Sequence, residues 1–150
     1  MKFAKLGFVV GLITLLLSGT FYASAYAREL AIIANKDYPL NSISASAVKD
    51  IYLGEKTSEG GVKIKPMEQR DEAIKKRFIE KVMGSTVDGY KAYWIKKFFQ
   101  EGVTPPTSKG SPVEMIQAIS QTGGSVGYVW ADEVKGDSGV KVLLKIEVGN

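Results

Sequence analysis

The sequence contains no cysteine and no histidine. Without cysteine the chain can form no disulfide and offers no thiol for lipid attachment, so its stability must come from a hydrophobic core. Without histidine it lacks the base of Ser-His-Asp and Cys-His catalysis and a common zinc ligand. The sequence therefore predicts no metal and no cofactor, and an enzyme would have to rely on carboxylate, lysine or tyrosine chemistry.

The net charge of residues 28–150 is also small. Of the 20 basic and 16 acidic residues, only Lys2 and Lys5 fall within residues 1–27, which leaves residues 28–150 with a balance of +2. A general nucleic-acid binder carries a strong basic excess. We therefore expect no nucleic acid among the partners.

Residues 1–27 have the pattern of a secretory signal peptide. Lys2 and Lys5 precede an apolar stretch from Leu6 to Leu17, and Ala25-Tyr26-Ala27 matches the small-residue cleavage pattern. An uncleaved anchor is the alternative, but a helix over that stretch is about 18 Å long and a hydrocarbon core is about 30 Å thick. We expect cleavage after Ala27, no membrane insertion afterwards, and one soluble domain of residues 28–150 in the periplasm.

Strand and helix patterns alternate along residues 28–150, which favours an α/β sandwich over a helical bundle. Strands are predicted at 29–36, 61–69, 125–130 and 139–146, and helices end at Gly54, Gly84 and Gly102. The helix starts are predicted at Ser44 or Ser46, at Asp71, at Ser85 with Asp88 as a capping box, and at Ser111 with Pro112 and Glu114.

The stretch YKAYWIKKFF at 90–99 allows two interpretations. Aromatic rings alternating with lysines can form a platform for nucleic-acid bases. However, Tyr90, Trp94 and Phe98 recur with Val87 at helical spacing, which is typical of a buried face. We expect the rings in the core and the lysines in solvent, and we expect the same solvated position for the basic cluster at 75–77 with Lys81.

The stretch QTGGSVGYVW at 121–130 raises a similar choice. Its successive amides could form an anion-binding nest, with hydroxyl groups from Thr122 and Ser125. However, the loop leads into a strand, and it contains no GxxxxGK[ST] or GxGxxG pattern. A helix stop followed by close packing at Gly127 explains the glycines equally well, and we favour that structural interpretation.

Taken in order, several motifs resemble the periplasmic phosphate-binding-protein-like (PstS-like) family over nearly all of residues 28–150. They are SASAVKDIYLGEK at 44–56, the RFIEKV helix at 77–82, YKAYW at 90–94, TPP at 104–106 and GGSVGYV at 123–129. The resemblance implies a type II periplasmic binding-protein fold, here a single lobe with a mixed sheet flanked by helices. It also implies phosphate capture for an ABC importer.

The sequence departs from that family at the helix that opens before Phe78. Full-length members have two lobes with the anion between them, and a Ser-Gly-Thr sequence opens this helix and binds phosphate. Here Glu72-Ala73-Ile74 follows Asp71, and like charge at a helix start opposes anion binding. Arg70 is the only nearby compensating donor, so no ligand residue of the family is carried over.

Two functions therefore remain open. One is an exported binding protein for phosphate or another small anion, working with an ABC permease. The other is an envelope protein-interaction module that keeps the fold without the ligand. We do not expect an enzyme. The candidate ligand residues are Gln69, Arg70, Thr122, Gly123, Gly124 and Ser125.

Overall fold

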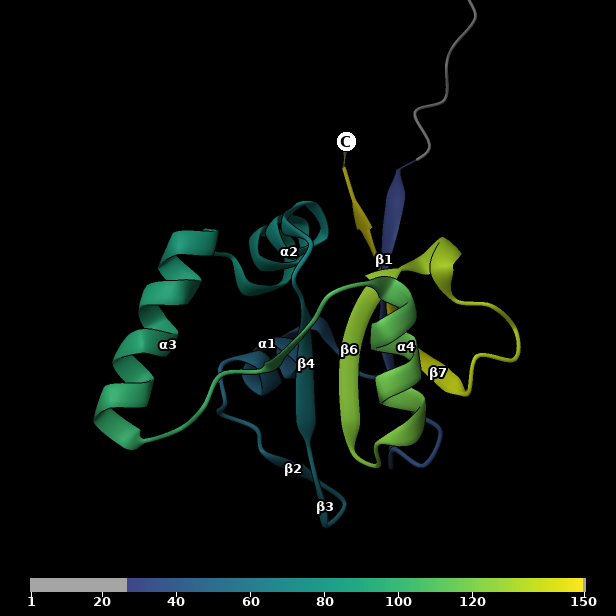
Figure 1. Ribbon diagram of the computed structural model, residues 1–150, viewed down its shortest axis with the longest axis horizontal. Helices are drawn as coiled ribbons and strands as arrows, with labels where there is room; N and C mark the ends of the chain where they lie inside the picture. The colour runs from purple at the N-terminus through teal and green to yellow at the C-terminus, as the bar shows by residue number, and fades with distance from the viewer. Residues whose placement is uncertain (1–26, 150) are drawn as a thin grey trace, which may run out of the picture.

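The computed structural model describes residues 27–149, so the predicted signal peptide lies outside the described residues apart from Ala27. A five-stranded mixed sheet with the order β5-β4-β6-β1-β7 forms its centre (Figure 1). The strands are β1 (Arg28–Asn35), β4 (Lys65–Gln69), β5 (Thr107–Lys109), β6 (Ser125–Trp130) and β7 (Val140–Val148), and β2 (Ser58–Glu59) and β3 (Val62–Lys63) form a separate hairpin.

Helices connect the strands of the sheet. They are α1 (Ala45–Tyr52), α2 (Glu72–Phe78), the π-helical turn η1 (Ile79–Met83), α3 (Val87–Glu101), α4 (Pro112–Gln121) and the 3-10 turn η2 (Ala131–Glu133). Strand β4 is parallel to β5 and β6, whereas β1 is antiparallel to both of its neighbours, β6 and β7. Within residues 27–149, no helix is both long enough and apolar enough to cross a membrane.

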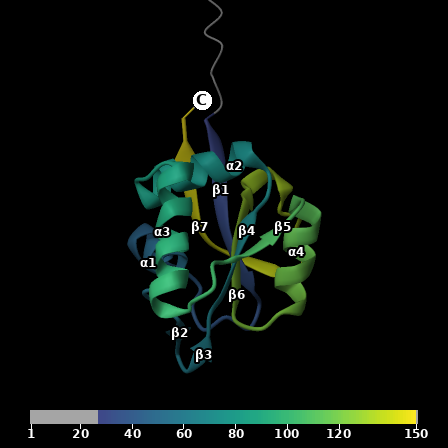
Figure 2. The same cartoon turned by 60° about the vertical axis from the view of Figure 1, so that its left-hand side comes forward.

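Strand β1 separates two hydrophobic cores. Leu30 and Ile32 belong to the core beneath α1, α2 and α3, and Ala31 and Ile33 belong to the core beneath α4. This division follows from the alternation of side chains along a strand. Figure 2 shows α1 and α3 on one side of the sheet and α4 on the other. The predicted α/β sandwich with a mixed sheet is therefore confirmed.

Close packing at Gly127 is confirmed. A Cβ atom at this position would lie 2.5 Å from Ile119 Cδ1 and 2.6 Å from Met115 Sδ. Glycine at 127 therefore lets the side chains of α4 pack directly on β6, because a Cβ atom would force Ile119 and Met115 to shift.

Most predicted helix ends are confirmed, and one is wrong. The side chains of Ser44 and Ser111 accept hydrogen bonds in the first turns of α1 and α4, and Gly54, Gly84 and Gly102 have positive φ. The cap of α3 is Thr86 and not Ser85, because Thr86 Oγ1 accepts a 3.0 Å hydrogen bond from Gly89 N. The cap lies one residue beyond the predicted position, directly before the first helical residue.

The helix predicted over 71–84 changes its winding after Phe78. The turn η1 is π-helical and contains Ile79, Val82 and Met83, all buried. Phe78 is buried as well, so the core-facing side of the helix continues through this change in winding.

The burial predicted for α3 is correct for Tyr90 and Trp94 and wrong for Val87 and Phe98, both of which are exposed. Phe98 is 47% exposed, whereas Lys97 is 8% exposed and forms ion pairs with Glu55 and Glu101. The helix turns Tyr90, Trp94 and Lys97 inward, and Phe98 lies at the edge of this face, about 100° around the helix from Lys97. Phe98 is therefore exposed although it was expected in the core, and Lys97 is buried although it was expected in solvent.

Candidate functional site

The candidate site lies where β4 and β5 end and α2 begins. In sheets with parallel strands, ligands commonly bind beyond the carboxyl ends of the strands. At this edge β4 contributes Glu68 and Gln69, β5 contributes Ser108, and α2 contributes Lys75. Sequence analysis missed Glu68, Lys75 and Ser108, although an acidic residue inside an apolar strand pattern is a signal that could have found Glu68.

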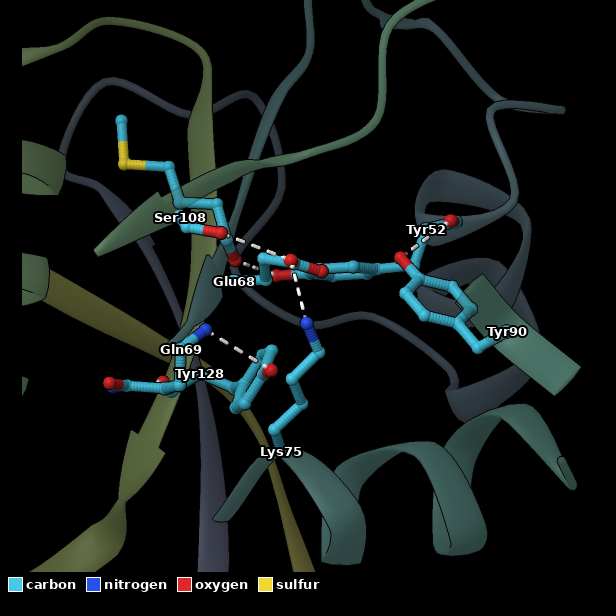
Figure 3. Close-up of polar contacts among 8 residues, drawn as sticks. Tyr52, Glu68, Gln69, Lys75, Tyr90, Ser108 and Tyr128 are labelled. Atoms are coloured by element: carbon cyan, nitrogen blue, oxygen red, sulfur yellow. Dashed lines mark hydrogen bonds and ion pairs between the residues drawn. The ribbon is translucent and has the colours of Figure 1, made fainter. Parts of the chain in front are cut away.

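Glu68 is a nearly buried carboxylate with two donors. Lys75 Nζ lies 2.9 Å from Glu68 Oε1, and Ser108 Oγ donates a 3.1 Å hydrogen bond to the same oxygen. Figure 3 shows Glu68 between these two groups. Lys75 was expected in solvent with the other basic residues of its helix, and the structure corrects this, because its ammonium group neutralises a buried charge.

Three tyrosines surround the carboxylate and hold their protons tightly. Burial, reinforced by the negative charge of Glu68, raises the pKa of Tyr52, Tyr90 and Tyr128 well above the ordinary value of 10.0. The hydroxyl of Tyr52 donates to Met67 O at 2.7 Å, and that of Tyr90 donates to Tyr52 O at 3.2 Å. The Tyr128 hydroxyl accepts a 3.2 Å hydrogen bond from Gln69 N, so the three hydroxyls have structural roles and do not act as bases near neutral pH.

A groove of about 330 Å³ opens beside Glu68 and Lys75, between them and α3. Its lining is mainly apolar and includes Val87, Tyr90, Trp94, Ile95, Phe98, Phe99 and Pro105. Ile95 is 50% exposed and Phe99 is 80% exposed. The groove thus continues onto an exposed apolar surface of α3, formed by Val87, Ile95, Phe98 and Phe99, which we call the α3 face.

The first amides of α2 are already occupied. Asp71 caps the helix, and its Oδ1 accepts hydrogen bonds from Ala73 N at 2.9 Å and Ile74 N at 3.2 Å. Glu72 adds a second acidic residue in the first turn. A carboxylate of the chain itself therefore takes the position that an external anion would need.

Two of the predicted ligand residues lie at this edge of the sheet. Gln69 is fully buried, and its side-chain amide donates to Tyr128 O at 3.0 Å while its backbone amide donates to the Tyr128 hydroxyl at 3.2 Å. Arg70 is exposed, and its backbone amide donates to Lys109 O at 2.8 Å. Its guanidinium group forms no ion pair within residues 27–149. Only Arg70 of this pair could reach a ligand.

The other predicted ligand residues lie at the opposite end of the sheet. Ser125 pairs with Lys65 at the start of β4, four residues before Gln69, a separation of about 13 Å along a strand. Its hydroxyl donates to Thr122 O and Ile119 O, and Gly124 contacts the backbone of Lys63. The structure therefore does not bring the two groups of candidates together.

The site has the means to bind and few means to catalyse. The Glu68 carboxylate is paired, and the neighbouring tyrosines keep their protons. Residues 27–149 contain no group of three His, Cys, Asp or Glu side chains placed to hold a metal ion. The remaining chemistry is apolar contact in the groove together with polar contacts at its rim.

No protein-family model matches the chain, and no curated protein matches it in sequence. Solved structures do match. A phosphate ABC transporter substrate-binding protein from Clostridium perfringens, solved with bound phosphate, is 17% identical, with a TM-score of 0.62 over 77% of this chain and 44% of its own length. An ABC-type phosphate transport receptor from Vibrio cholerae is 21% identical, with a TM-score of 0.61 over 77% of this chain and 45% of its own length.

PstS from Borrelia burgdorferi is 16% identical, with a TM-score of 0.61 over 77% of this chain and 46% of its own length. These proteins are binding proteins, and this chain spans less than half the length of each. At these identities the likeness concerns the fold. The chain therefore has a PstS-like, substrate-binding-protein fold over 77% of its length.

Proposed function

We propose that the chain is an exported binding domain without enzymatic activity, and that it binds an envelope protein through the α3 face and the groove beside it. The observation that carries this proposal is the exposure of large apolar side chains along one helix. Val87, Ile95, Phe98 and Phe99 are all at least 36% exposed, and three of them lie within five residues of α3. Contiguous apolar patches on a protein surface commonly mark interaction sites.

The position of the groove supports the same function. The α3 face borders the edge of the sheet where Glu68 and Lys75 lie, and Lys91 adds a positive charge to the lining. A partner that places an apolar side chain in the groove can therefore also make polar contacts at its rim. This is the usual composition of a protein interface, with an apolar centre and a polar border.

Phosphate capture for an ABC importer is the alternative function, and the solved neighbours are phosphate-binding proteins of that kind. Two carboxylates of this chain oppose phosphate binding at this site. Asp71 occupies the first amides of α2, and Glu68 forms a 2.9 Å ion pair with the partly buried Lys75. A tight anion site needs several converging donors, and these donors are already engaged.

Photo-crosslinking in the producing cells tests the proposal. A benzoylphenylalanine in place of Phe99 should give a discrete crosslinked product, because this side chain is 80% exposed on the α3 face. The product should disappear when Ile95→Asp is added, since a buried charge in the contact disfavours association.

Val113 provides the matched control. It is 75% exposed on α4, across the sheet from α3, and it belongs to neither the groove nor the α3 face. Benzoylphenylalanine at position 113 should give no discrete product. Equal crosslinking from positions 99 and 113, or none from position 99, would overturn the proposed function.

A further inference from the structure

We propose that a second groove, at the end of β4 opposite to Glu68, binds an anionic sugar that carries a phosphate or carboxylate group. This groove has a volume of about 430 Å³ and lies among the β2–β3 hairpin, the start of β4 and the segment that joins α3 to β5. Figure 1 shows the hairpin and α2 at opposite ends of β4. The inference goes beyond the proposed function, because the α3 face is not needed for it.

The charged side chains that line this groove are all positive. Its lining contains three lysines and four threonines, and the residues relevant here are Lys56, Lys63, Lys65, Thr57, Thr107 and Thr122. No aspartate or glutamate of the described residues belongs to the lining. A cleft with one sign of charge attracts ligands of the opposite sign, so the groove is suited to an anion.

Two of the lysines are available to a ligand. Lys56 forms an ion pair with Glu59, whereas Lys63 and Lys65 form no ion pair within residues 27–149. Lys63 ends β3 and Lys65 begins β4, and both are exposed while Ile64 between them is 4% exposed, so their side chains share the solvent side of this segment. Both ammonium groups can therefore reach one phosphate or carboxylate group.

The backbone that carries these lysines is held from two directions. Lys65 N donates a 2.9 Å hydrogen bond to Gly124 O, and Ile64 N donates a 2.9 Å hydrogen bond to Thr57 O. Gly124 has φ +76°, and a Cβ atom there would lie 2.2 Å from Lys63 O. The glycine loop thus fixes the lysine segment in place, which lowers the entropy lost on binding.

The remaining surface of the groove suits a ring with hydroxyl groups. Trp94, Pro105 and Pro106 contribute an apolar floor, and the threonine hydroxyls can donate and accept hydrogen bonds. A sugar ring has one apolar face of C–H groups and polar edges, so it can contact both. A volume of this size is within the usual range for small-molecule sites.

Nuclear magnetic resonance titration of the isotope-labelled exported protein tests the inference. Glucose 6-phosphate and glucuronate are the probes, and the separate parts are glucose with inorganic phosphate for the first and glucose with acetate for the second. At least one probe should shift the amide signals of Lys63, Lys65 and Thr122 and the indole signal of Trp94, with a dissociation constant below about 1 mM. Each part alone should bind at least about tenfold more weakly, because it lacks the floor or the lysine contacts.

Charge-matched variants separate this site from general attraction. Lys63→Gln and Lys65→Gln should each weaken binding of the better probe by about tenfold or more. Lys96→Gln on exposed α3 removes the same charge outside the groove and should leave binding unchanged. The inference fails if neither probe shifts these signals, if the shifts fall at Arg70 and the start of α2, or if Lys96→Gln has the same effect as Lys63→Gln.

Discussion

At the scale of single residues, the fold uses its aromatic side chains in two ways. Tyr52, Phe78 and Tyr128 pack together in the core, with Phe78 and Tyr128 stacked at 3.9 Å between ring centroids. Phe98 and Phe99 contact each other at 5.6 Å, and both are exposed. The first set stabilises the domain, and the second set is available to a partner.

Trp94 and Phe98 should therefore respond differently to truncation. Trp94 is 6% exposed, so Trp94→Ala should lower the free energy of unfolding by roughly 3 to 5 kcal/mol, as loss of a large buried aromatic side chain does. Phe98→Ala, at an exposed position, should change it by less than about 1 kcal/mol. Urea denaturation followed by circular dichroism measures both, and equal losses would contradict the burial described here.

The buried tyrosines of the candidate site should make the free energy of unfolding fall as the pH becomes alkaline. Burial, then the charge of Glu68, raises the pKa of Tyr90 above its ordinary value of 10.0. Because the pKa of Tyr90 is raised on folding, its contribution to the free energy of unfolding is complete below pH 10. That contribution is lost as the pH rises from there toward the folded-state pKa. The loss should be about 1.4 kcal/mol per pH unit for each such tyrosine.

Tyr90→Phe tests this assignment. The variant should be about 1 kcal/mol less stable at pH 9, because the hydrogen bond to Tyr52 O is lost. Between pH 10 and pH 11 its denaturation midpoint should fall less steeply than that of the parent protein. Parallel slopes for the two proteins would show that Tyr90 does not ionise with a raised pKa.

At the scale of elements, the glycine loop before β6 has a structural role that its sequence indicates only in part. Gly124 needs a left-handed backbone and lies against Lys63, whereas Gly123 has neither constraint. Gly124→Ala should therefore destabilise the protein by about 2 kcal/mol or more, since both strain and a steric clash oppose the new methyl group. Gly123→Ala should leave the free energy of unfolding nearly unchanged. Thermal denaturation of both variants measures the two effects, and similar losses at both positions would contradict this difference.

Elements with local signals could be predicted from the sequence, and α4 is the clearest case. Ser111 and Pro112 define its start, and Met115 and Ile119 define its buried side, all within one short segment. Helix α3 has weaker signals, because apolar residues lie all around it, and the buried Lys97 forms a long-range ion pair with Glu55 besides its local pair with Glu101. The exposure of Phe98 depends on that long-range contact, so helical periodicity could not predict it.

At the scale of the whole molecule, the order of strands decides which residues can form a site. Gln69 and Ser125 lie on neighbouring strands but at opposite ends of them, because β4 and β6 are parallel with Lys65 opposite Ser125. This register is absent from the local sequence, so the candidate ligand residues were grouped without it. The PstS-like fold was recognisable from motifs, whereas the ion pair of Glu68 with Lys75 required the packing of α2 on β4.

The length of the chain adds a second consideration at this scale. It spans less than half the length of the phosphate-binding proteins that share its fold, so these residues account for only part of the neighbours' structures. The α3 face and the first groove are exposed within residues 27–149. A protein partner that covers this surface would bury apolar area that the isolated domain leaves in water.

Isothermal titration of the purified protein with inorganic phosphate, at low ionic strength, tests the central claim most directly. Because Asp71 and Glu68 occupy the donors at the end of β4, we predict no saturable binding tighter than about 1 mM. Low ionic strength favours any weak electrostatic contact, including one with Arg70, so the test is a stringent one. A submicromolar dissociation constant for the monomeric protein, removed by Arg70→Ala, would contradict the account and identify the chain as a phosphate-binding protein.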